Sequence, residues 1–303
     1  SFDLWLTLIA PNRQSHEART ALLSKELGVE NNEEFSQLIR SVSKSLDVRA
    51  EETHENYSCA DRINLLCDTL HIPRLAADEL VRVSNLCQES IRNNQPTLLN
   101  PNTATILKSL KSQGYKLALI SNTGYPEAPV MREILSNLGI AQLFDCLVFS
   151  SEVGRSKPSP AMFKRVAGKI GCNLNEILHI GDSIKADYEG ALLAGSQALH
   201  FDACGAHTTH AVASLDELLN IFSYLDKANV TRSSLYTLTT DGKKTIDQSG
   251  LEFSADEYSR FKHGDSSIQE KYGHSLAQHF INNFNQIIKH GEELVIAPFA
   301  YMN

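Results

Sequence analysis

Polar residues that could perform chemistry lie at the ends of four predicted strands of this 303-residue chain. They are Asp3 with Thr7, the run Ser121-Asn122-Thr123, Lys157 before Pro158, and Asp182 with Asp187. Each is ordinary on its own, since a carboxylate after a strand is often only a helix cap and a loop lysine is usually solvated. All four in this order are difficult to obtain by chance, and they predict one anionic pocket that also contains a cation.

Asp3 is the candidate nucleophile, because it is the only candidate at the mouth of the first predicted strand. Attack of its carboxylate on phosphorus would give an acyl phosphate that water must later cleave. Two anions repel each other, so we expect a metal held by Asp3 and Asp182, with Asp187 ligating it or orienting a water. Hard oxygen ligands of this kind favour Mg²⁺.

The other polar stretches supply groups that stabilise a phosphoryl group. Ser121 and the backbone N–H groups after it can donate hydrogen bonds to phosphoryl oxygens, and Lys157 brings positive charge to the place where negative charge builds up. We therefore predict that Ser121 and Lys157 are catalytic together with the nucleophile. Thr7, Asn122 and Thr123 complete the prediction as substrate-binding residues.

The composition is that of a globular chain with one large or two modest domains, because 42% of the residues are hydrophobic and 21% are charged. The formal charge is −8, from Lys+Arg 28 and Asp+Glu 36, and no basic block is present. Nucleic acid is therefore disfavoured as a partner. The apolar runs are far shorter than the ~18 to 20 residues of a bilayer span, so we expect no membrane segment. The six cysteines lie far apart without a CxxC pair, which favours a reducing cytoplasm over a disulfide scaffold.

The elements that position the polar stretches follow an alternating pattern. After an opening strand at residues 2–6, helical spacing of apolar residues continues through 15–45, 55–70 and 76–93. Beyond Pro96, β-rich runs at 116–121, 145–150, 177–180 and 196–201 alternate with helices predicted at 102–113, 128–138, 160–170, 184–194 and 215–225. This alternation predicts an α/β fold with a Rossmann-like parallel sheet covered on both faces.

One strand before the helical stretch and several after it predict a discontinuous domain. Residues 1–12 and 97–227 would form the sheet core, and residues 13–96 would form an inserted helical cap. Active sites of such sheets lie beyond the carboxyl ends of the strands, so the cap is expected over the site. Residues 228–303 predict a small α+β appendage, whose long amphipathic helix is the expected contact if the chain forms a homo-oligomer.

The four stretches together resemble the haloacid dehalogenase (HAD) superfamily of hydrolases, from Ser1 to about Asp226. Its signatures correspond to FDLWLTL at 2–8, LISN at 119–122, Lys157-Pro158, and HIGDS at 179–183 followed by Asp187. The resemblance implies a HAD core, bound Mg²⁺ and the residue roles given above, with the backbone carbonyl of Trp5 as a further metal ligand. More weakly, RFKHGD at 260–265 and the helix after it resemble the start of a phosphoribosyltransferase-like domain.

Trp5 departs from the family pattern. HAD phosphatases usually have a second Asp two residues after the nucleophile, as general acid and base, and indole cannot exchange a proton near neutral pH. Another group must then provide the acid–base catalysis, which typically raises the rate ~10²–10⁴-fold. Candidates are His16, His54 and Glu55, although for each of them an ordinary surface role is favoured.

Three functions remain open from the sequence. The favoured one is a Mg²⁺-dependent HAD phosphatase that hydrolyses a small phosphorylated metabolite or nucleotide through an aspartyl phosphate. The second is a metal-free, dehalogenase-like hydrolase that attacks carbon, since such family members often have an aromatic residue at the position of Trp5. Asp182 and Asp187 argue against it, because a metal-free site has less use for two more carboxylates. The third is a non-catalytic sensor that retains the binding pocket.

Overall fold

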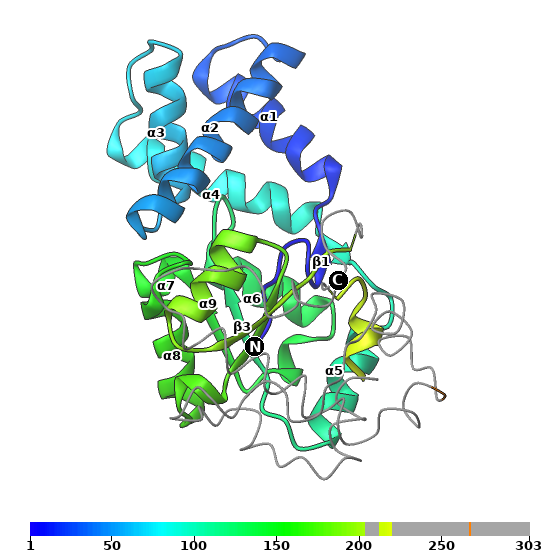
Figure 1. Ribbon diagram of the computed structural model, residues 1–303. Coiled ribbons are helices and arrows are strands. Elements are labelled where there is room, and N and C mark those ends of the chain that lie inside the picture. The colour runs from blue at the N-terminus through cyan, green and yellow to red at the C-terminus, as the bar shows by residue number, and fades with distance from the viewer. Residues whose placement is uncertain (204–211, 220–266, 268–303) are drawn as a thin grey trace.

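The computed structural model describes residues 1–203, 212–219 and 267, and these residues form a sheet core and a four-helix insertion (Figure 1). The appendage predicted at 228–303 lies outside the described residues, apart from Ser267. Of the helix predicted at 215–225, residues 215–219 are described and are helical.

A parallel sheet is assembled from two strand pairs and the opening residues. β3 (Ala118–Ser121) pairs with β4 (Cys146–Phe149), and β5 (Leu178–Gly181) pairs with β6 (Gln197–His200), both in parallel. Phe2 lies between the two pairs and forms parallel bridges to β3 and β5. The order across the sheet is therefore β4, β3, Phe2, β5, β6, which is the Rossmann-like arrangement that the alternating pattern predicts.

The opening strand is shorter than the predicted run of residues 2–6. The Asp3 N–H donates to the carbonyl of Ile180 at 2.8 Å, but the Leu4 carbonyl accepts from the N–H groups of Leu8 and Ile9 and not from a neighbouring strand. Leu6 has φ of 59°, in the left-handed region. The chain therefore leaves the sheet just after Asp3 and turns toward the insertion.

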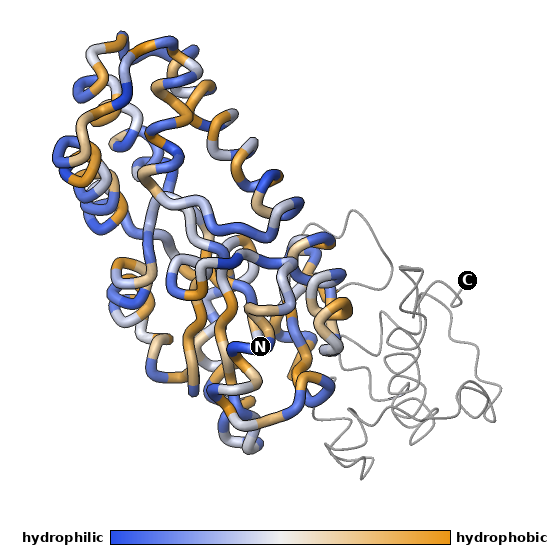
Figure 2. The backbone as a smooth tube through the Cα atoms, turned by 90° about the vertical axis from the view of Figure 1, so that its left-hand side faces the viewer, coloured by the Kyte–Doolittle hydropathy of each residue, from blue (hydrophilic) through white to orange (hydrophobic). Residues whose placement is uncertain are grey.

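Both faces of the sheet are covered by helices, because successive residues of the central strand enter two different apolar clusters. Leu119 packs with α5 (Thr103–Ser112) and α6 (Ala128–Asn137), whereas Ile120 packs with α8 (Pro160–Ile170) and α9 (Gly190–Leu193). A strand buried on both sides is a nearly continuous apolar run, which is visible as orange segments in Figure 2. Shorter elements join these helices: η1 (Ala141–Leu143), α7 (Ser150–Val153) and η2 (Leu174–Glu176).

The four-helix insertion stands as a separate layer in Figure 1. It consists of α1 (Arg13–Leu27), α2 (Glu33–Thr53), α3 (Cys59–Thr69) and α4 (Ala77–Asn93). The strands that lead into and out of it, β1 (Ile9–Ala10) and β2 (Thr97–Leu98), pair antiparallel. The insertion therefore leaves and rejoins the core at one place.

Local sequence explains where these helices begin. Asn32 caps α2 by accepting the N–H of Phe35 at 2.9 Å, and Ser58 forms a capping box with Asp61 at the start of α3. The buried side of α2 repeats at helical spacing, with Phe35, Ile39, Val42, Leu46 and Ala50.

The helix predicted at 184–194 is divided into two different elements. Residues Ile184–Glu189 form a π-helix, η3, in which the Tyr188 N–H donates to the Ser183 carbonyl at 3.1 Å. The α-helix α9 then begins at Gly190. Wide turns of this kind are frequent at functional sites, and this one carries Asp187.

None of the helices within the described residues is long and apolar enough to cross a bilayer. The five cysteines in the described part of the chain are free, as their spacing predicts, and Cys204 lies outside it.

Candidate active site

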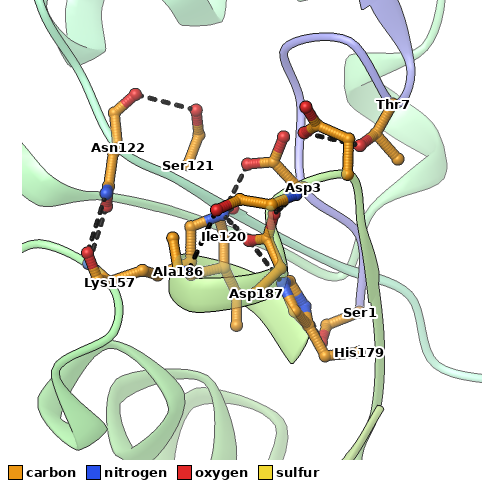
Figure 3. A network of polar contacts seen from close by, with 12 residues as sticks. Ser1, Asp3, Thr7, Ile120, Ser121, Asn122, Lys157, His179, Ala186 and Asp187 are labelled. Carbon is orange, nitrogen blue, oxygen red and sulfur yellow. Dashed lines mark hydrogen bonds and ion pairs between the residues drawn. The ribbon is translucent and has the colours of Figure 1, made fainter. Parts of the chain in front are cut away.

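Three aspartates converge at the carboxyl edge of the sheet, and two of them, Asp3 and Asp187, are labelled in Figure 3. Asp3 follows the bridge at Phe2, Asp182 follows β5, and Asp187 lies in η3. One carboxylate oxygen of each lies within 4.8 Å of the others. Parallel strands end at the same edge of a sheet, which is why residues so distant in sequence meet here.

Lys157 reaches the centre of this group from the loop before α8, and its side chain is 2% exposed. Its ammonium group donates to Asp3 Oδ1 and Asp187 Oδ1, each at 2.5 Å, and to the Ile120 carbonyl at 2.9 Å. Burial by itself would lower the pKa of Lys157, but the charges of Asp187 and Asp3 raise it above its usual value. The lysine therefore stays protonated, with all three N–H groups paired.

Asp187 accepts hydrogen bonds from several sides. Besides the lysine, its Oδ1 lies 3.1 Å from Nε2 of His179, and its Oδ2 accepts from the Ser183 N–H at 3.0 Å. Burial would raise the pKa of Asp187, but Lys157 and His179 hold it below its ordinary value. Burial also lowers the pKa of His179 to about 4, so the ring is neutral and its proton is on Nε2, facing the carboxylate.

Asp3 and Asp182 carry the carboxyl groups whose ionised forms are least favoured in this pocket. Burial raises the pKa of Asp3 to about 7 and that of Asp182 to about 6, and the charge of Asp187 acts in the same direction. Three carboxylates thus face one ammonium group, and a divalent cation would favour the ionised forms of all three. An all-oxygen set of this kind fits Mg²⁺. Thr7 lies beside the same group and donates to Asp182 Oδ1 at 3.5 Å.

The segment after β3 contributes three predicted residues with different surroundings. Ser121 is buried and its hydroxyl lies 3.2 Å from the Asn122 carbonyl. The Asn122 side chain accepts from the Lys157 N–H at 2.7 Å and donates to the Lys157 carbonyl at 3.0 Å. These two bonds hold the backbone of the lysine loop. Contact between Asn122 and substrate stays a prediction.

Thr123 is connected by hydrogen bonds to two residues that the sequence did not predict, Ser150 and Asn56. Its N–H donates to Ser150 Oγ at 2.8 Å, and the Ser150 hydroxyl donates to Asn56 Oδ1 at 2.7 Å. Ser150 is fully buried and directly follows β4, so its position at a strand end was a usable signal. Asn56 lies between α2 and α3, and no motif marks it.

Trp5 is partly buried against the main apolar cluster. Of the three candidates for replacing the acid–base residue, two adjoin the lysine loop through their backbone: the His54 carbonyl accepts from the Ser156 N–H at 3.1 Å, and Glu55 forms a bridge with Arg155. His16 contacts Ser36 Oγ at 2.9 Å within the insertion, His54 caps the end of α2, and Glu55 is exposed. Within the described residues, no hydrogen bond or ion pair joins any of the three to the aspartates.

A family model described as haloacid dehalogenase-like hydrolase matches residues 2–195, which is more than half of the 303-residue chain and includes the four polar stretches. The chain belongs to the haloacid dehalogenase-like hydrolases. The resemblance carried by the motifs is thereby confirmed, and so is the α/β fold. A second model, for ComF-like phosphoribosyltransferases, matches residues 230–299 and confirms the weaker C-terminal resemblance.

Curated relatives of this HAD hydrolase include two phosphatases. The phosphoserine phosphatase of Thermus thermophilus is 32% identical over 121 residues, or 40% of this chain and 47% of that protein. The glyceraldehyde 3-phosphate phosphatase of Methanothermobacter thermautotrophicus is 37% identical over 99 residues, which are 33% of this chain and 42% of that protein. The chain thus spans about half the length of these curated relatives.

A solved structure gives the same fold. The HAD hydrolase of Bacillus subtilis, solved bound to magnesium, superposes with a TM-score of 0.57 at 19% identity and covers 73% of this chain and 96% of its own. The similarity at this identity concerns the fold alone.

Proposed function

We propose that this HAD hydrolase is a Mg²⁺-dependent phosphatase of a small phosphorylated metabolite, acting through an aspartyl phosphate on Asp3. The observation that carries the proposal is the pairing of the buried Asp3 carboxylate with Lys157 Nζ at 2.5 Å, inside a cluster of three carboxylates. A lone buried carboxylate would be protonated and unreactive. Asp3 instead lies where a cation and two further acidic groups can bind and orient a phosphate.

In the first step, a carboxylate oxygen of Asp3 attacks phosphorus and the bond from phosphorus to the leaving oxygen breaks. Lys157 stays bound to Asp3 Oδ1, which leaves the other oxygen to attack. Ser121 donates its hydroxyl to a phosphoryl oxygen, after turning from the Asn122 carbonyl. In the second step, water attacks the acyl phosphate, which releases inorganic phosphate and regenerates the Asp3 carboxylate.

The acidic residues would hold the metal. We propose Asp3, Asp182 and the Trp5 backbone carbonyl as its ligands, with Asp187 ligating it or orienting one of its waters. Bound Mg²⁺ supplies positive charge that offsets the repulsion between the nucleophile and the phosphate. Asp187 suits the orienting role, since Lys157 and His179 already occupy its Oδ1.

Trp5 restricts the leaving group. Without a carboxyl group at this position, the leaving oxygen departs with little proton donation. We therefore propose substrates whose leaving group is stable as an anion, such as acyl phosphates or phosphoanhydrides. Ordinary phosphomonoesters of alcohols would react more slowly.

The test is phosphate release from a panel of acyl phosphates, anhydrides and monoesters, with Mg²⁺ or with a chelator. We expect release that requires Mg²⁺, and at least a ~10³-fold loss in Asp3→Asn. The matched control is Asp68→Asn, which removes an exposed carboxylate paired with Arg74 and should leave the rate unchanged. Equal activity of Asp3→Asn and wild type would remove Asp3 from the mechanism.

A dehalogenase-like reaction is the second candidate. The (S)-2-haloacid dehalogenase 2 of a Pseudomonas species is 26% identical over 177 residues, which are 53% of this chain and 76% of that protein. Halide release from 2-haloacids in the presence of a chelator would favour this function. Turnover of neither substrate class would favour a binding module.

A further inference from the structure

Two arginines of the four-helix insertion carry side-chain N–H groups that the described structure leaves unpaired. Arg62 of α3 is 3% exposed. Its guanidinium donates to the Ser43 carbonyl at 3.1 Å and to Asp47 Oδ1 at 2.7 Å, while its buried Nε has no hydrogen-bond partner within the described residues. Buried N–H groups are nearly always paired in native proteins, so an unpaired one on a cation calls for an explanation.

Arg19 of α1 has the same feature. Its Nε is buried and has no partner in the part of the chain that the structure describes, and its Nη2 lies 3.3 Å from Nδ1 of His16. The guanidinium lies 4.1 Å from the centre of the Tyr125 ring. Burial lowers the pKa of Arg19, which means that water solvates this cation poorly.

Both arginines face the loop that leads away from the phosphoryl-binding segment. Tyr125 is four residues after Ser121 and is 5% exposed, and the Arg62 guanidinium carbon lies 5.8 Å from the centre of its ring. A Cβ added at Gly124 would lie 3.2 Å from Nη2 of Arg62. The two guanidinium groups therefore lie where the insertion contacts the loop that follows the phosphoryl-binding segment.

The charges in this arginine pair do not balance. Asp47 is the acidic residue that pairs with Arg62, its side chain is 64% exposed, and within the described residues no carboxylate hydrogen-bonds to Arg19. Two cations and one anion leave one positive charge. A carboxylate, with one negative charge and two acceptor oxygens, matches that excess and can accept from both free N–H groups. A second phosphate would bring about two negative charges at neutral pH and exceed it.

We propose that Arg19 and Arg62 bind a carboxylate on the leaving group, so that the substrate carries a free carboxylate as well as its phosphoryl group. This inference rests on the proposed function, because it assumes that the phosphoryl group is bound at Asp3. The two guanidinium groups lie 4.1 and 5.8 Å from the centre of the same Tyr125 ring, so one planar anion can reach both. Specificity would then come from the insertion, and the chemistry from the core.

The experiment measures binding of two non-hydrolysable phosphonates to the full chain by calorimetry in the presence of Mg²⁺. The probes are 2-carboxyethylphosphonate and propylphosphonate, which differ by a carboxylate in place of a methyl group. We expect wild type to bind the carboxylated probe about tenfold or more tightly. Arg19→Gln and Arg62→Gln should lose this preference while binding propylphosphonate with unchanged affinity.

Arg82→Gln is the matched control. Arg82 also belongs to the four-helix insertion, in α4, but its side chain is 54% exposed and paired with Glu26. This control variant should keep the full preference. Arg62→Lys keeps the positive charge but loses the planar guanidinium group, so this variant should retain only part of the preference for the carboxylated probe. Thermal unfolding of each variant shows whether it folds. If Arg62→Gln does not fold, Arg19→Gln alone tests the proposal.

Equal binding of the two probes by wild type would overturn the proposal, and so would a preference that persists in both glutamine variants. Absence of any binding by the carboxylated probe would also overturn it. Preferential binding without phosphatase activity on any substrate would instead overturn only the proposed function and leave the carboxylate site in place.

Discussion

Lys157 connects three parts of the site through one ammonium group, which donates to Asp3, Asp187 and the Ile120 carbonyl. The sequence predicted its charge but not this arrangement, in which the lysine holds two carboxylates at once. Its contacts make Lys157 a structural residue as well as a proposed catalytic one.

Replacing Lys157 by Met should therefore have two effects. The rate of phosphate release should fall ~10²–10³-fold, because positive charge near the phosphoryl group is lost. Stability without metal should also fall, by about 3 kcal/mol, because buried carboxylates lose their partner. Mg²⁺ should then raise the melting temperature of the variant more than that of wild type. A smaller Mg²⁺ effect in the variant would contradict this account of the lysine.

Asp182 offers a test of the metal site that does not depend on turnover. Mg²⁺ should raise the melting temperature of wild type, because a ligand that binds only the folded state stabilises it by mass action. Asp182→Asn should abolish most of the rise, whereas Asp216→Asn, which removes an exposed carboxylate next to Asn100, should keep it. Equal shifts in both variants would place the metal elsewhere.

At the scale of elements, the glycine that ends β5 has a specific role. A Cβ at Gly181 would overlap the Asp187 carboxylate, so η3 can approach the strand only because this side chain is missing. Gly181→Ala should displace Asp187 and lower the rate by ~10²-fold or more. In Gly168→Ala, within α8, the added Cβ meets nothing within 4 Å, so the stability should be unchanged or higher by about 0.5–1 kcal/mol. A normal rate in Gly181→Ala would show that η3 tolerates a shift.

Asp145 joins α5 to the residue before β3, accepting from Lys111 Nζ and from the Leu117 N–H, both at 2.7 Å. Burial would raise the pKa of Asp145, but these two donors lower it below its ordinary value. A lowered carboxyl pKa contributes stability above the unfolded pKa of about 3.9, and that contribution is lost as the pH falls through the folded value.

Asp145→Asn should accordingly be less stable than wild type by about 0.5–1 kcal/mol near pH 7, a modest value because the pair is about one-third exposed. The difference should shrink as the pH falls from about 5 to about 3. Denaturant titrations of both proteins across that range measure it. A difference that grows toward acid pH would reverse the assigned sign.

At the scale of the whole molecule, the helices and strands of the described residues follow the sequence pattern closely, because each carries its own periodicity. The strand predicted at 116–121 is β3 (Ala118–Ser121), and the helix predicted at 160–170 is α8 (Pro160–Ile170). The parallel sheet was predictable for the same reason, since apolar runs alternate with amphipathic helices.

What the sequence could not predict depends on how the insertion meets the core. Several of the contacts there are made by single side chains: Asn56 with Ser150 at 2.7 Å, Glu51 with Lys185 at 3.6 Å, and Arg92 with Glu133 at 2.8 Å. No spacing rule links residues of the insertion with residues of the core. The three aspartates were easier to predict, because the ends of parallel strands must meet at one edge.

The central claim is that Asp3 becomes phosphorylated during turnover. The most direct measurement mixes the full chain with Mg²⁺ and a small acyl phosphate such as acetyl phosphate, quenches with acid within one turnover, and maps the phosphoryl group by peptide mass spectrometry. The account predicts a phosphoryl group on Asp3 in wild type and none in Asp3→Asn. Release of phosphate without a phosphorylated Asp3, or the same labelling in both proteins, would contradict it.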